Sequence, residues 1–125
     1  PVGINNTIEN LSSKYDLAIV SNNYAKIVSK GLDSYALSGY FKLVLGAEHG
    51  LMKPNPDLLI KCMERLQHKP QQTVFVGDMD GDIIAGKLAK LKKVVAVSYG
   101  YHTIKKLKDA DAIVNKPIEL IDAVK

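Results

Sequence analysis

The sequence predicts a three-layer α/β fold in which helices cover both faces of a doubly wound, mostly parallel sheet. Short apolar segments alternate along the chain with longer amphipathic ones, an order typical of strands joined by crossover helices. The apolar segments are hydrophobic on both faces, as expected where helices cover both sides of a sheet. With 125 residues, 46% of them hydrophobic, the chain has enough material for one core. We therefore expect a single folded unit over residues 1–125.

Five apolar segments have the length of buried strands, and each is closed by a polar residue or a glycine. They are residues 16–20, 42–45, 73–76, 94–97 and 112–114. The carboxyl ends of parallel strands meet at one edge of the sheet, and ligands of such folds bind beyond that edge. Ser21, Lys53 and Asp78 lie at or shortly after the first three ends. We therefore expect the functional site among these three residues.

Six further segments have helical character. They are residues 4–14, 24–35, 56–68, 79–91, 103–109 and 117–124. Two of these helices have clear start signals, because a proline is followed by an acidic residue within the expected first turn. The pairs are Pro56 with Asp57 and Pro117 with Glu119, and both residue types favour the first turn of a helix.

The net charge of +4 does not by itself predict binding to nucleic acid. Of the 17 basic residues only Arg65 is an arginine, and arginine is the side chain best suited to reading bases through paired hydrogen bonds. We interpret the lysines as a solvated basic face and expect no nucleic-acid partner.

The remaining composition favours a cytoplasmic protein. Cys62 is the only cysteine, so no disulfide can form within the chain, as is usual in a reducing compartment. No apolar run reaches the ~18 residues of a membrane span, and the first residues lack the basic-then-apolar pattern of a secretion signal. We therefore expect a cytoplasmic location and no membrane partner.

Ser21 and Asn22 follow the first predicted strand and precede a helix. A hydroxyl at this position, together with the free backbone N–H groups of the next turn, forms a possible anion site. Serine and asparagine are equally common as simple helix caps and in side-chain turns. The motif alone leaves both interpretations open.

Lys53 is followed by Pro-Asn-Pro-Asp, in which Pro54 and Pro56 stiffen the loop. Proline after Lys53 also disfavours helical geometry at the lysine. A lysine on a rigid loop is a preorganised positive charge that suits a phosphoryl group. The alternative is an ordinary surface lysine before a helix.

Asp78, Asp80 and Asp82 lie at the predicted turn between the third strand and its helix. Carboxylates this close repel one another unless a cation lies among them, and Mg²⁺ is typically held by one or two carboxylates with water and phosphate oxygens. A calcium EF-hand would need glycine in place of Ile83 and glutamate in place of Ala89, so that interpretation fails. The structural alternative is an acidic cap favoured by the helix dipole.

In this order the three motifs resemble those of the haloacid dehalogenase-like (HAD) superfamily of phosphohydrolases, particularly its phosphoglycolate phosphatase-like members. Ile-Val-Ser21-Asn-Asn resembles the second HAD motif, and Lys53-Pro-Asn-Pro-Asp resembles the third. Gly-Asp78-Met-Asp-Gly-Asp82 resembles the fourth, Gly-Asp-x-x-x-Asp. The resemblance covers nearly the whole chain.

The resemblance implies a HAD-type, Rossmann-like fold and a role for each motif. Ser21 and Asn22 would bind the phosphoryl group, and Lys53 would bind it and act as the catalytic lysine. Asp78 and Asp82 would hold Mg²⁺, and the family pattern leaves the position between them free. The implied substrate is a small phosphorylated metabolite.

One motif of the family is absent. The first, Asp-x-Asp-Gly-Thr, ends a central strand and carries the nucleophile, whereas Asp78-Met-Asp-Gly follows the other motifs and fits the fourth position better. We therefore expect residues 1–125 to be the C-terminal part of a HAD-like core domain, without the central strand and the cap. A preceding N-terminal segment or a second polypeptide would supply that strand. Ile19 and Phe75 should then not lie on directly paired strands.

The function implied for the intact protein is Mg²⁺-dependent hydrolysis of phosphate monoesters through an aspartyl-phosphate, with the 125-residue chain alone inactive. A receiver-like signalling domain is one alternative, but receivers place the acidic pair first and the lysine last, the reverse of the order here. A catalytically silent phosphate- or metal-binding module is the other.

Overall fold

The computed structural model describes residues 3–98 and 109–125 and confirms the α/β class. The strands are β1 (Leu17–Val20), β2 (Phe41–Leu45), β3 (Val74–Gly77), β4 (Lys93–Val97) and β5 (Ala112–Val114). The main helices are α1 (Ile4–Ser12), α2 (Ala25–Ser34), α3 (Asp57–Leu66) and α4 (Asp80–Leu88). Short 3-10 turns before the C-terminal segment are η1 (Ser38–Tyr40), η2 (Ala47–His49) and η3 (Pro70–Gln72). The helix expected over 103–109 lies almost wholly outside the described residues.

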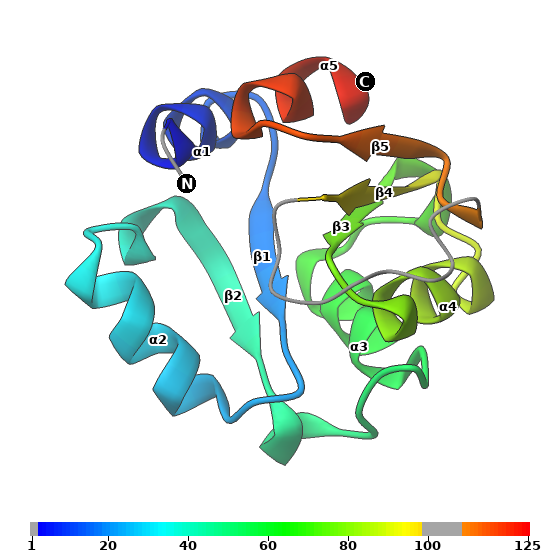
Figure 1. The fold of residues 1–125 in the computed structure, drawn as a ribbon. Helices are drawn as coiled ribbons and strands as arrows, with labels where there is room; N and C mark the ends of the chain where they lie inside the picture. The colour runs from blue at the N-terminus through cyan, green and yellow to red at the C-terminus, as the bar shows by residue number, and fades with distance from the viewer. Residues whose placement is uncertain (1–2, 99–108) are drawn as a thin grey trace.

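The strands form two parallel sheets rather than one. Among the described residues, β1 pairs only with β2, while β3, β4 and β5 pair in that order, and Figure 1 shows the two groups separated. Ile19 lies opposite Val44, and Phe75 lies opposite Val94. Ile19 and Phe75 are therefore not on paired strands, as the sequence led us to expect. We call the two groups the β1–β2 half and the β3–β5 half.

Both faces of the larger sheet are covered. In β4 the side chains alternate between the two faces: Val94 and Ala96 pack against Ile83 of α4, whereas Val95 and Val97 pack on the other side with residues of α1 and α5. This arrangement explains why the strand is apolar on both faces.

Helix α3 connects the two halves through the core. Leu58 and Leu59 are buried, and they belong to one cluster with Val20 of β1, Leu45 of β2 and Ala85 of α4. Because this cluster takes residues from both sheets, apolar packing holds the halves together although their strands do not pair.

The C-terminal segment differs from the predicted single helix over 117–124. It begins as the 3-10 turn η5 (Pro117–Glu119) and continues as the short helix α5 (Leu120–Ala123). Glu119 accepts hydrogen bonds from the backbone N–H groups of Asn115 and Lys116, at 2.6 and 2.9 Å. These bonds close a tight turn ahead of the helix, and 3-10 geometry is common at helix starts.

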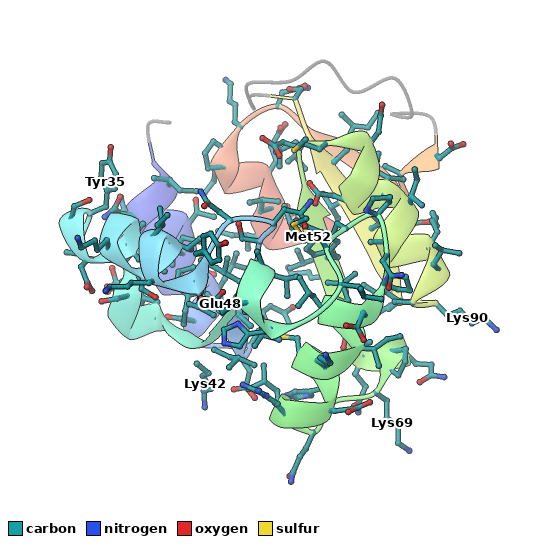
Figure 2. All side chains as sticks on the ribbon, turned by 90° about the horizontal axis from the view of Figure 1, so that it is seen from below. Tyr35, Lys42, Glu48, Met52, Lys69 and Lys90 are labelled. Carbon is teal, nitrogen blue, oxygen red and sulfur yellow. The ribbon has the colours of Figure 1, made fainter. Side chains whose placement is uncertain are left out.

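Several lysines of the described residues lie on the surface. Lys42, Lys69 and Lys90 are exposed, and Figure 2 shows them at the outside of the molecule. Within residues 3–98 and 109–125, no helix combines the length and the hydrophobicity needed to cross a membrane.

Candidate active site

The structure brings the three sequence motifs together at the carboxyl ends of β1 and β3. Lys53 Nζ lies 2.6 Å from Asp82 Oδ1 and 3.1 Å from the carbonyl oxygen of Val20. The backbone of Lys53 also contacts the side chain of Asn22, next to Ser21. Residues far apart in sequence therefore meet at the sheet edge where ligands of such folds bind.

Lys53 is held on several sides. Its side chain is only 12% exposed, and its ammonium lies 5.2 Å from the centre of the Phe75 ring, a distance at which a cation is attracted to an aromatic face. The ammonium also forms an ion pair with Asp82 of α4 and donates to the carbonyl at the end of β1. Lys53 thus contacts both the β1–β2 half and the β3–β5 half.

Both carboxylate oxygens of Asp82 have partners. Oδ1 accepts from Lys53, and Oδ2 accepts from the backbone N–H groups of Asp78 and Met79, at 3.0 and 3.1 Å. A buried charge is tolerated only with such partners. Gly77 packs directly on this side chain, since a Cβ at position 77 would collide with it. Asp82 therefore caps α4 and orients Lys53, which partly matches the structural alternative of an acidic cap.

Asp78 lies half-buried at the end of β3, and its carboxylate has no hydrogen bond or ion pair with the described residues. Within the described ranges, no three His, Cys, Asp or Glu side chains form a metal-binding group. Asp78 beside Asp82 nevertheless fits a Mg²⁺ ion that takes its other ligands from water and substrate. Asp82 could bind such an ion only if a carboxylate oxygen contacted the ion in addition to, or instead of, its present hydrogen-bond donors.

Ser21 continues the edge of β1, because its backbone N–H donates to Leu45 at 2.9 Å. Its hydroxyl oxygen accepts the N–H of Asn23 at 3.0 Å, which is the side-chain turn expected as one alternative. The hydroxyl uses a lone pair here, so its own O–H can still donate to an anion.

Glu48 is a site neighbour that the sequence did not indicate. From η2 it accepts the N–H of Ala25 at 2.9 Å, and this bond holds the pKa of the Glu48 carboxyl below its ordinary value of 4.5. Glu48 therefore takes one of the backbone donors at the start of α2 that an anion site would otherwise use. Nothing in the spacing of the sequence relates Glu48 to Ala25.

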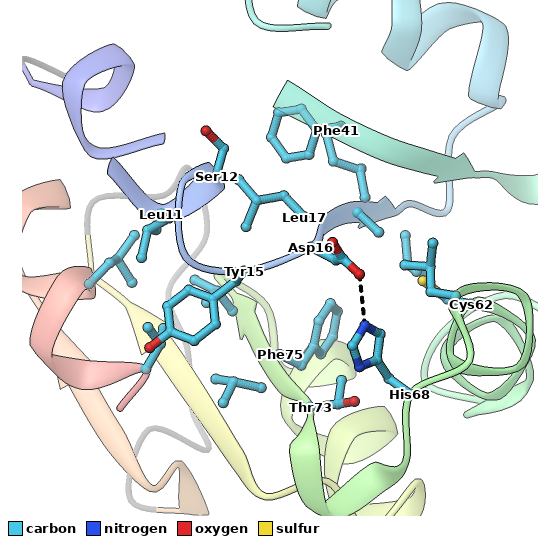
Figure 3. A pocket seen from close by; sticks show the side chains of 18 of the residues that line it. Leu11, Ser12, Tyr15, Asp16, Leu17, Phe41, Cys62, His68, Thr73 and Phe75 are labelled. Atoms are coloured by element: carbon cyan, nitrogen blue, oxygen red, sulfur yellow. Dashed lines mark hydrogen bonds and ion pairs between the residues drawn. The ribbon is translucent and has the colours of Figure 1, made fainter. Parts of the chain in front are cut away.

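A cavity of about 1060 Å³ separates the two halves. Its walls include all four residues of β1 and all four of β3, so the facing edges of both strands border the same space. Figure 3 shows Leu17 and Phe75 lining it and the Asp16–His68 hydrogen bond crossing it. Asp78 and Gly77 line it as well, so the cavity extends to the candidate site.

The fold and these contacts define an α/β protein whose functional groups gather at the carboxyl ends of parallel strands. The chain belongs to the haloacid dehalogenase-like hydrolase family, whose sequence model matches residues 2–97. This match confirms the resemblance inferred from the three motifs.

Named relatives agree with the family assignment. The chain is 43% identical over 97 residues to a phosphoglycolate phosphatase of Aquifex aeolicus, covering 76% of this chain and 45% of that protein. It is 32% identical over 127 residues to the pyrophosphatase PpaX of Halalkalibacterium halodurans, covering 98% and 58% respectively. The chain thus spans about half the length of the curated relatives that it matches.

Solved structures show the same fold. A crystal structure of a predicted phosphoglycolate phosphatase from Haemophilus somnus superposes with a TM-score of 0.91 and 26% identity, covering 99% of this chain and 56% of that one. A haloacid dehalogenase-like hydrolase from Streptococcus pneumoniae superposes with a TM-score of 0.88 and 20% identity, covering 100% and 60%.

Proposed function

We propose that the active protein hydrolyses phosphate monoesters of small metabolites, and that residues 1–125 form the C-terminal part of its HAD-like core domain. The observation that carries this proposal is the fixed position of Lys53, between the end of β1 and Asp82 and close to the Ser21 loop. The names of the relatives, phosphoglycolate phosphatase and pyrophosphatase, support the same substrate class.

Each site residue has a role in this proposal. The Ser21 hydroxyl and the Asn22 backbone would donate to phosphoryl oxygens, and the Lys53 ammonium would offset their charge. Asp78 would hold Mg²⁺ directly, with Asp82 assisting through its charge. When bound, Mg²⁺ would add positive charge beside the phosphoryl group. A carboxylate nucleophile would attack the phosphorus atom, so that the ester P–O bond breaks and the alcohol leaves with a proton from solvent. Water would then hydrolyse the aspartyl-phosphate, which releases inorganic phosphate and restores the carboxylate.

We further propose that the cavity between β1 and β3 receives the strand that carries this nucleophile. Backbone N–H and C=O groups on a strand edge cost free energy if they are buried without partners. A parallel strand placed between β1 and β3 would pair with both edges and join the two sheets into one. A segment N-terminal to residue 1, or a second polypeptide, would supply it.

The test compares this chain with a fusion that carries the N-terminal portion of the Aquifex aeolicus relative ahead of residue 1. With Mg²⁺ and p-nitrophenyl phosphate, we expect negligible turnover by the chain alone and clear turnover by the fusion. In the fusion, Lys53→Ala should lower kcat by about 100-fold or more, the usual effect of removing a group that stabilises charge in the transition state. Lys30→Ala, on the exposed surface of α2, is the matched control and should have no effect.

Three results would contradict the proposal. Turnover by the chain alone that is lost on Asp78→Asn would mean that another nucleophile exists within it. A folded but inactive fusion would favour a catalytically silent module. Stoichiometric labelling of the chain by acetyl phosphate would instead favour the receiver-like alternative.

A further inference from the structure

The side chain of Asn22 pairs with both polar backbone groups of Lys53. Asn22 Oδ1 accepts the Lys53 N–H at 2.8 Å, and Asn22 Nδ2 donates to the Lys53 carbonyl at 3.0 Å. The two residues are 31 positions apart and lie in different loops. A carboxamide has one acceptor and one donor group side by side, so it can bind a peptide backbone as a neighbouring strand would.

Asn22 is itself held in place by its neighbours. The N–H of Ser21 donates to Leu45, and the N–H of Asn23 donates to the Ser21 hydroxyl. The carbonyl of Asn23 accepts the N–H of Ala47 at 2.9 Å. The loop that carries Asn22 is therefore anchored to the end of the β1–β2 half, and its carboxamide has a defined position.

The loop around Lys53 is also ordered from within. Asp57 accepts the N–H of Leu51 at 2.9 Å, and the N–H of Asn55 donates to the carbonyl of Met52 at 3.0 Å. These bonds shape the loop but leave its position relative to β1 open. The Asn22 carboxamide fixes that position, because it attaches the backbone of Lys53 to the residue two places beyond Val20.

The backbone and the ammonium of Lys53 are thus both bound near the carboxyl end of β1. The backbone is bound by Asn22, and the ammonium donates to Val20 and Asp82. A lysine side chain is long and flexible, and holding it in one geometry costs conformational entropy. Fixing the backbone limits the positions that the ammonium can reach and lowers this cost.

We propose that the side chain of Asn22 is a positioning group for Lys53, separate from the contact that its backbone would make with phosphate. Its carboxamide keeps the Lys53 ammonium between Val20 and Asp82. The relevance to catalysis rests on the proposed function, but the positioning itself is a property of the folded chain.

The experiment measures how fast each lysine is acylated by a limiting amount of an amine-reactive reagent, with the sites quantified by mass spectrometry. Lys53 should react slowly in the unaltered chain, because it is nearly buried and ion-paired. We expect Asn22→Ala to raise the rate at Lys53 about tenfold relative to the exposed Lys26, a ratio equivalent to about 1.4 kcal/mol. Asn23→Ala is the matched control, since within the described part of the chain that side chain bonds only the N–H of Tyr24, and it should leave the ratio unchanged.

A second variant separates positioning from a loss of folding. General unfolding would also raise the ratio of Lys53 to Lys26, but it would at the same time raise the rate at the partly buried Lys93, whose ammonium donates to the carbonyl of Ala123. An unchanged rate at Lys93 therefore shows that the variant is folded. Asn22→Asp keeps the acceptor but loses the donor, and it should give a Lys53 rate between those of the unaltered chain and Asn22→Ala. If the ratio of Lys53 to Lys26 stays the same in both variants, Asn22 does not position Lys53.

Inorganic phosphate distinguishes this inference from the proposed function. If phosphate with Mg²⁺ slows labelling of Lys53 in the unaltered chain, the phosphate site is supported. If phosphate has no effect but Asn22→Ala still raises the rate at Lys53, the positioning role stands and the phosphate site fails. If phosphate protects Lys53 while the Asn22 variants leave its labelling ratio unchanged, the positioning role is wrong and the phosphate site stands.

Discussion

Asp82 is a buried carboxylate that forms an ion pair with Lys53. Its side chain is 6% exposed, and the ion pair with Lys53 is the contact that balances its charge. Removing one partner of a buried pair is far more costly than removing both, because it leaves an uncompensated charge. The free energy of unfolding therefore depends on an ion pair that belongs to the candidate site.

We expect Lys53→Met to lower the free energy of unfolding by about 3 kcal/mol, since methionine keeps the apolar stem but leaves Asp82 unpaired. Combining it with Asp82→Asn should recover much of this loss, because an amide oxygen can still accept the backbone N–H groups of Asp78 and Met79. Urea denaturation measures both variants.

The matched control for this prediction is Lys61→Met. Lys61 also pairs with an aspartate, Asp57, but its side chain is 43% exposed. Exposed pairs contribute little, so the control should cost less than about 1 kcal/mol. A double variant no more stable than Lys53→Met alone would mean that the unpaired charge is not the cause.

The positions of the candidate site residues in the fold could be predicted, but their contacts could not. Ser21, Lys53 and Asp78 lie where apolar segments end, and parallel topology alone brings such positions to one edge. The pairing of Asn22 with Lys53 depends on how two separate loops pack, which no periodicity of the sequence encodes. The same holds for Glu48 at the start of α2.

At the scale of elements, the strands were the most predictable part of the fold. Each is a short apolar segment closed by a polar residue or glycine, and each lies within one or two residues of its predicted bounds. The C-terminal segment was less predictable, because Pro117 and Glu119 mark a start without specifying whether the first turn is 3-10 or α. Helix α4 begins where predicted, and its start depends on a close contact at Gly77.

We expect Gly77→Ala to destabilise the protein by about 1–3 kcal/mol, the usual cost of overpacking. The added Cβ would collide with the side chain of Asp82, which both caps α4 and binds Lys53. The melting temperature measures the effect, and faster acylation of Lys53 would show that the ion pair is loosened.

Gly31→Ala is a control for which we expect the opposite effect, an increase in stability. Gly31 lies within α2, and a Cβ there would meet no atom within 4 Å. Replacing glycine by alanine in an open helical position stabilises by roughly 0.5–1 kcal/mol. If Gly77→Ala were as stable as the unaltered chain or more stable, contact with Asp82 would not limit the side chain at position 77.

At the scale of the whole molecule, the two halves are joined by contacts other than strand pairing. The apolar cluster around α3 is one, and the Lys53–Asp82 pair at the carboxyl end of the strands is another. At the far end of β1, Asp16 accepts from His68 Nε2 at 2.8 Å and pairs with Lys42 at 3.1 Å (Figure 3). His68 follows α3 and belongs to the β3–β5 side, so this polar contact spans the cavity.

This contact predicts a specific dependence of stability on pH. The hydrogen bond from His68, and then that from Lys42, hold the pKa of the Asp16 carboxyl below its ordinary value of 3.8. A carboxyl whose pKa is lowered by folding stabilises the protein above the unfolded pKa, and this contribution is lost as the pH falls through the folded pKa. Asp16→Asn should therefore be less stable than the unaltered chain at neutral pH, with the difference disappearing below pH 3.8. Urea midpoints across this range measure the difference, and Asp33→Asn on the exposed surface of α2 is the control. A difference that persisted unchanged into acid would mean that the Asp16 charge does not link the two halves.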